Sequence, residues 1–207
     1  SLGLMFDESM QKLSEQEQKR LIQTKFKEEE AFWNELFSIA SKQNITIVMA
    51  GGNQNILVGL DPMDRSSYPI KVSAIKADET KADFSNWGGY SDISAPGDQI
   101  YNAVLGNKYA LMSGTSMASP IVAGAAALMY SVNPGISPYD LKIILQQTSK
   151  PISGNNSKYI GNIIQIANAI KKAKTGIPPK LPCSESQEKI DSLQDQINKL
   201  KSDCLNN

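Results

Sequence analysis

Apolar and polar residues along the chain form blocks that predict helices and short buried strands. Residues 45–52, ITIVMAGG, make a β-branched apolar run that ends in glycines, which is typical of a buried strand. The preceding run 31–44, AFWNELFSIASKQN, places four apolar side chains on one helical face, which we expect to pack on a sheet: Phe32, Leu36, Phe37 and Ala40. A helix followed by such a strand favours a βαβ unit and a parallel sheet.

Further elements follow from the same patterns. Residues 7–30 are dense in Gln, Lys and Glu with scattered apolar residues, which predicts a charged helical insertion on the surface. Residues 116–130 are small or apolar throughout, and a helix that is apolar on all sides is normally buried in a large core. Three other segments are predicted as regular structure: the end of a buried strand at 1–5, a strand at 70–75, and an amphipathic helix at 137–148 with Ser137 as its N-cap.

The C-terminal part of the sequence differs in composition from the rest. Residues 1–174 are predicted to form one domain, residues 175–183 (TGIPPKLPC) a Pro-rich linker, and residues 184–207 a short heptad tail. The tail spaces its apolar residues by 3, 4 and 3, as in a coiled-coil seam: Ile190, Leu193, Ile197 and Leu200. About two heptads are too few to decide between a homo-oligomeric contact and a tail that folds back on its own domain.

Composition excludes some classes of function. The 207 residues hold 21 Lys and Arg against 21 Asp and Glu, so the sequence lacks the basic excess of a general nucleic-acid or anionic-membrane binder. We expect no membrane span, because we find no apolar run long enough to cross a bilayer. Without histidine or a CxxC pair, no ordinary zinc site is expected. Cys183 and Cys204 would lie roughly 31 Å apart on one continuous helix, too far for an intrachain disulfide.

The candidate chemistry lies in residues 114–120, GTSMASP. A serine in the first turn of a helix presents its hydroxyl beside free backbone N–H groups, which favour developing negative charge. Gly114 allows a substrate to approach the backbone closely, and Pro120 needs no donor near the helix start. Ser116 is therefore a candidate nucleophile, while Thr115 and Ser119 are expected to be structural.

The run SGTSMASP followed by VAGAAAL resembles the nucleophile motif of the subtilisin-like serine proteases, the subtilases. This resemblance implies an α/β fold, part of a three-layer subtilisin-like architecture with a mostly parallel sheet flanked by helices, to which the heptad helix is appended. It also implies that Ser116 is the nucleophile of peptide-bond hydrolysis through an acyl-enzyme, so the expected substrate is a polypeptide.

Other motifs of the same family follow in order. VMAGGNQN (48–55) resembles the strand-end motif that supplies an oxyanion-binding asparagine, which would be Asn53 with Gly51 and Gly52 beside the substrate. Ser1, Leu2 and Gly3 resemble its substrate-binding strand, and FSNWG and DISAPG (84–97) resemble two further signatures. Asn55 stands where the family usually has glycine.

The absence of histidine is the main departure from the family. The family's triad runs Asp, His, Ser along the chain, its first two motifs precede the SLG segment, and Asp61, Asp64 and Asp92 do not match the aspartate motif. We therefore expect a C-terminal portion of a protease, inactive alone, whose partner is the N-terminal part that carries Asp and His. The alternative is a catalytically dead pseudoprotease that acts as a binding domain. At family level the resemblance also makes calcium possible and favours an extracellular or periplasmic location.

Overall fold

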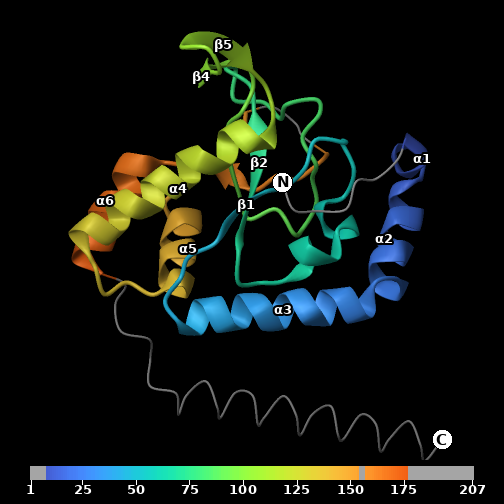
Figure 1. Ribbon diagram of the computed structural model, residues 1–207, viewed down its shortest axis with the longest axis horizontal. Helices are drawn as coiled ribbons and strands as arrows, with labels where there is room; N and C mark the ends of the chain where they lie inside the picture. The colour runs from blue at the N-terminus through green and yellow to red at the C-terminus, as the bar shows by residue number, and fades with distance from the viewer. Residues whose placement is uncertain (1–7, 154–156, 177–207) are drawn as a thin grey trace, which may run out of the picture. The chain divides into compact units, whose positions relative to one another are not determined.

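The computed structural model describes residues 8–153 and 157–176 (Figure 1). The chain divides into two compact units, Ser1–Gly176 and Ile177–Asn207, and every described residue belongs to the first. The predicted strand at 1–5, most of the predicted linker and the heptad tail with both cysteines lie outside the described residues.

A parallel sheet forms the centre of the described part. Its strands are β1 (Val48–Ala50), β2 (Ile70–Ile75), β3 (Ile93–Pro96) and β6 (Asn162–Ile163), in the spatial order β1-β2-β3-β6. All three strand pairs are parallel, and every residue of β2 is buried. The predicted parallel sheet is confirmed, and the predicted strand at 70–75 coincides with β2.

Three helices precede the sheet: α1 (Glu8–Gln11), α2 (Glu15–Thr24) and α3 (Lys27–Lys42). Ser14 and Glu17 cap α2 with a reciprocal capping box, and Gln18 and Ile22 on the same helix are buried. Helices α2 and α3 contact the two short 3-10 helices that follow β1, which are η1 (Val58–Leu60) and η2 (Pro62–Arg65). Most of residues 8–30 are thus helical, and two of them, Gln18 and Ile22, are buried; that this segment is an insertion stays a prediction.

The predicted inward face of α3 is wrong in two of its four members. Phe37 is buried and stacks on Trp33, but Phe32 is 60% exposed and Leu36 is 43% exposed. The helix contacts η2, and its Glu30 carboxylate accepts from Arg65 of η2 at 3.0 Å. The periodicity found the helix, but the apolar residues cover more than one face, so periodicity alone did not identify the buried one.

Helix α4 (Thr115–Val132) packs across β1, β2 and β3 and against α6 (Ile166–Thr175). Its side toward the sheet is buried, but Leu128 is 49% exposed and Val132 is 38% exposed, so the prediction that this helix is buried all round is wrong. By length and composition alone α4 could cross a membrane, which contradicts the expectation that no apolar run is long enough. In the described part it serves as the core helix of the sheet.

Two further features complete the described part. The antiparallel hairpin of β4 (Ile100–Val104) and β5 (Lys108–Met112) leads directly into α4 and projects from the body (Figure 1). Helix α5 (Pro138–Gln147) begins at Ser137, whose hydroxyl accepts from the backbone N–H of Asp140, so the predicted N-cap is confirmed.

Candidate active site

Ser116 lies in the first turn of α4, at the point where the chain leaves the hairpin. Its side chain is exposed. Thr115 begins the helix after Gly114; in this first turn the Thr115 N–H donates to Asn53 Oδ1 and the Met117 N–H to the Gly114 carbonyl, while a Ser116 N–H at this position has no partner inside the helix. The Ser116 hydroxyl therefore sits beside backbone donors and at the positive end of the helix dipole, as the motif predicts.

Asn53 is held against this helix start by Thr115. The Asn53 Oδ1 atom accepts from the Thr115 backbone N–H at 2.8 Å and from the Thr115 hydroxyl at 2.9 Å. The other end of the amide, Nδ2, lies 3.5 Å from the position that a Cβ on Gly114 would take. The two Thr115 hydrogen bonds thus hold the Oδ1 end of the amide, and its Nδ2 end lies beside Gly114 at the start of α4.

The Thr115 side chain ties the strand-end loop to the helix. It is fully buried, and its hydroxyl oxygen also accepts from the Gly52 backbone N–H at 3.1 Å. The sequence suggested a structural role for Thr115 without showing what it holds. The structure shows that this one hydroxyl contacts both the loop backbone and the Asn53 amide.

Asn86 shapes the same loop from the other side. Its Oδ1 accepts from the backbone N–H groups of Gln54 and Ile56, at 2.9 and 3.1 Å. Sequence reasoning gave it no role, although it lies inside the FSNWG signature, which was the one signal that could have found it. Asn86 and Thr115 together hold the turn that presents Asn53.

Gly97, which follows β3, lies in close contact with Gly114, which precedes α4. The Gly97 carbonyl accepts from the Gly114 N–H at 2.7 Å. A Cβ on Gly97 would lie 2.6 Å from the Ala74 Cβ and 2.9 Å from the Gly114 carbonyl oxygen, so only glycine allows this approach. The DISAPG signature thus has a steric explanation.

The Gly52→Ala substitution is expected to destabilise the protein by about 1–3 kcal/mol. Gly52 has a φ of +96°, and an added Cβ would lie 2.2 Å from the Asn86 Nδ2 atom. Chemical denaturation of the variant measures the loss. Gly89→Ala is the matched control, since no atom lies within 4 Å of its added Cβ, and an equal loss in both variants would contradict the steric explanation.

The backbone conformation at position 55 shows why asparagine can stand where the family usually has glycine. Its φ is +55°, a conformation that glycine and asparagine tolerate best. The Asn55 Oδ1 accepts from the ammonium groups of Lys81 and Lys158, each at 3.0 Å. Burial lowers the pKa of Lys81 to about 8, and the nearby charge of Lys158 acts in the same direction.

The structure brings together only part of the predicted site. Ser116 and Asn53 meet through Thr115, and Gly51 and Gly52 lie in the loop that carries Asn53. The three predicted substrate-strand residues lie outside the described residues: Ser1, Leu2 and Gly3. Within residues 8–153 and 157–176, no group of three acidic or cysteine side chains is placed to hold a metal ion.

Comparison with known proteins shows which family this chain resembles. The family model described as the subtilase family matches residues 7–178. A thermophilic serine proteinase from Bacillus sp. (strain AK1) is 38% identical over 124 residues, which are 60% of this chain and 30% of that protein.

Solved structures show the same fold. A protease from Pseudoalteromonas arctica aligns with a TM-score of 0.62 and 25% identity, over 68% of this chain and 46% of that one. A cold-adapted subtilisin-like serine proteinase aligns with a TM-score of 0.58 and 30% identity, over 61% of this chain and 46% of that one. The chain thus spans less than half the length of each of these three relatives.

Proposed function

Since the chain belongs to the subtilase family, we propose that it carries the nucleophile and the oxyanion-binding amide of a serine endopeptidase. The observation that supports this most is the pair of hydrogen bonds from Thr115 to Asn53 Oδ1, at 2.8 and 2.9 Å. They fix an amide donor beside an exposed serine in the first turn of a helix.

The proposed chemistry is acyl transfer. Ser116 Oγ attacks the carbonyl carbon of the scissile peptide bond, and its proton passes to a histidine base. The carbonyl oxygen becomes an oxyanion, which accepts from Asn53 Nδ2 and from the Ser116 backbone N–H. The C–N bond then breaks, the amine leaves with the proton from the base, and the Ser116 ester is hydrolysed by water.

The base must come from outside these residues, because the 207 residues contain no histidine. A serine hydroxyl without a base is a weak nucleophile. We therefore propose that a histidine and its orienting aspartate belong to another part of the protease, and that this chain is inactive alone. The partial coverage of the related structures supports this proposal, since each holds more than half of its length outside the matched region.

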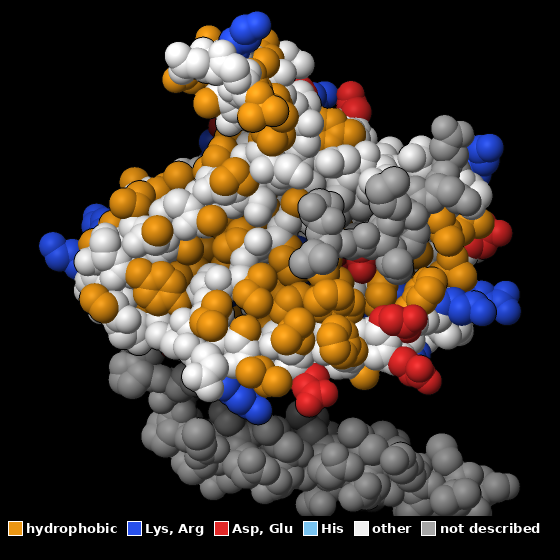
Figure 2. All heavy atoms as spheres, viewed as in Figure 1, with side chains coloured by type: hydrophobic (Ala, Val, Ile, Leu, Met, Phe, Trp, Pro, Cys, Tyr) orange, Lys and Arg blue, Asp and Glu red, His pale blue; other side chains and the backbone are white. Residues whose placement is uncertain are grey.

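The surface of the described part supports such a partner. Beginning at Ser116, α4 presents exposed residues at helical spacing on one side, which include Pro120, Gly124 and Leu128. In Figure 2, hydrophobic side chains gather along α4 and between α4 and α3. Strand β1 is at the edge of the four-stranded sheet. The side of β1 that faces away from β2 pairs with no strand of the described part. The partner half is proposed to cover this face and to bring its base to the Ser116 end of it.

Hydrolysis of an unfolded polypeptide by the full-length protein tests the proposed function. The rate constant kcat/KM is expected to rise with pH through one ionisation near pH 6–7, because a histidine base must be neutral to accept the proton. The 207-residue chain alone should show no hydrolysis. A folded full-length protein without activity would support the pseudoprotease alternative, for which the absence of histidine in this chain is the one favouring observation.

A further inference from the structure

An oxygen-lined cage lies beside the N-terminal ends of β2 and β3, away from Ser116. We define this oxygen cage by four oxygen-bearing groups: the Asp92 carboxylate and the backbone carbonyls of Ser66, Ser67 and Pro69. Carboxylate and backbone carbonyl oxygens are the ligands that hard cations such as Ca²⁺ prefer. The donor set is thus one that would suit an inorganic cation.

The first ammonium group in the cage belongs to Lys71, on β2. Lys71 Nζ donates to the Ser66 carbonyl at 2.7 Å and lies 3.1 Å from Asp92 Oδ2. The Lys71 residue is only 2% exposed. The same Asp92 oxygen also accepts from the Lys71 backbone N–H at 2.9 Å, which fixes the carboxylate to the strand.

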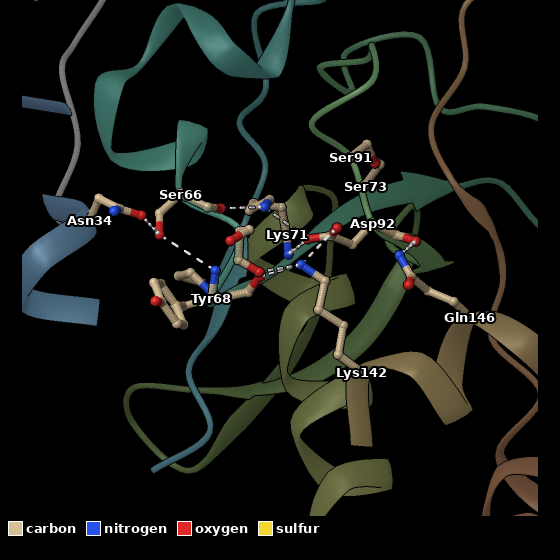
Figure 3. Close-up of polar contacts among 11 residues, drawn as sticks. Asn34, Ser66, Tyr68, Lys71, Ser73, Ser91, Asp92, Lys142 and Gln146 are labelled. Atoms are coloured by element: carbon tan, nitrogen blue, oxygen red, sulfur yellow. Dashed lines mark hydrogen bonds and ion pairs between the residues drawn. The ribbon is translucent and has the colours of Figure 1, made fainter. Parts of the chain in front are cut away.

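The second ammonium group belongs to Lys142, on α5. Lys142 Nζ lies 2.9 Å from Asp92 Oδ1, and it donates to the carbonyls of Ser67 at 2.8 Å and Pro69 at 2.9 Å. Figure 3 shows the two lysine side chains reaching Asp92 from different elements. Each of the four oxygen-bearing groups of the cage is therefore in contact with an ammonium group.

We propose that Lys71 and Lys142 fill an oxygen-lined cation site with their own ammonium groups, so that the site takes no metal ion while both are present. Two observations distinguish this arrangement from an ordinary ion pair. Three backbone carbonyls contribute as well as the carboxylate, and both lysine side chains are nearly buried, with 3% and 11% of their surface exposed.

Charge also opposes entry of a metal ion. The cage holds two ammonium groups and one carboxylate. Burial lowers the pKa of Lys142, and the Asp92 carboxylate opposes that effect by stabilising the charged form. The nearby Asp64 is buried with its Oδ1 atom unpartnered, and burial raises its pKa well above the usual range, so it offers little added negative charge.

The cage has a structural task that a metal ion would otherwise perform. It joins the turn at residues 66–69 to β2, β3 and α5. Val72, next to Lys71 on β2, accepts from the Gly51 N–H at 2.9 Å in the loop that carries Asn53. On this proposal calcium, which the resemblance makes possible for the family, does not bind at this place while both lysines are present.

Thermal unfolding of the full-length protein tests the proposal, which does not depend on the catalytic role of Ser116. The double variant Lys71→Met, Lys142→Ala removes both ammonium groups and leaves the four oxygen-bearing groups of the cage. In tetramethylammonium chloride its Tm is expected to lie about 5 °C or more below that of the wild type. Calcium chloride or sodium chloride at equal ionic strength should recover at least half of this deficit, because a small cation enters the cage.

The readout is the Tm difference between variant and wild type in each salt, so other cation sites cancel. Lys150→Ala, which removes a partly exposed ion pair with Glu79, is the control, and its deficit should be the same in all salts. If the double variant does not fold, Lys142→Ala alone should show a smaller deficit that calcium or sodium still reduces. A deficit that is equal in all three salts would overturn the proposal.

Discussion

Ser116→Ala is expected to abolish peptide-bond hydrolysis by the full-length protein, with kcat falling by about 10⁶-fold, the size of the effect of removing the nucleophile in subtilisin itself. Ser116 is exposed in the first turn of α4, and alanine at this position keeps the helix and its packing. The variant therefore loses the attacking oxygen while the oxyanion donors stay in place. Steady-state hydrolysis of a peptide substrate measures the change.

Ser131→Ala is the matched control for this variant. Ser131 is exposed on the same helix, and its hydroxyl donates only to the Leu128 carbonyl of its own helix. Its kcat should stay within about twofold of the wild type, as for most surface substitutions. A Ser116→Ala variant that keeps even 1% of the wild-type kcat would show that another residue is the nucleophile.

Asn53 is expected to have the second largest effect. Asn53→Ala should lower kcat by about 10²–10³-fold with little change in KM, because the proposed oxyanion forms during the reaction and is absent from the bound substrate. The variant also loses the acceptor for Thr115, so it cannot by itself separate catalysis from loop geometry. A second substitution is needed for that separation.

Asn53→Asp makes the separation. The carboxylate keeps an acceptor for both Thr115 hydrogen bonds but replaces the Nδ2 donor with a negatively charged oxygen. Its kcat should fall at least as far as that of Asn53→Ala. Asn55→Gly, two residues away and with a φ that glycine accepts, should keep kcat within a few-fold. If both Asn53 variants changed only KM, the oxyanion role would be wrong.

Local signals explain how much of this fold could be predicted from the sequence. The strand at 70–75 and the Ser137 cap were found because each depends on a few adjacent residues. The inward face of α3 was misjudged because apolar residues lie on more than one side of this helix, and tertiary packing, which the sequence pattern does not show, decides which of them is buried. The exposed face of α4 was missed for the same reason.

The candidate site shows a similar division. The motifs predicted Ser116 at a helix start and Asn53 after a strand, and the structure places both residues there, while their catalytic roles stay predictions. The roles of Thr115 and of the oxygen cage could not be predicted, because both join residues far apart in the chain. Asp92 meets Lys71 only in the register that pairs Ile93 with Val72. No spacing along the sequence shows such a contact.

The central claim is that Ser116 is a serine nucleophile activated by a base from outside these 207 residues. Labelling with a fluorophosphonate, followed by mass spectrometry of the modified peptide, tests it most directly. We expect a phosphonyl adduct on Ser116 in the folded full-length protein and no adduct on the 207-residue chain alone. A folded full-length protein without an adduct at Ser116, or equal labelling of the isolated chain, would contradict it.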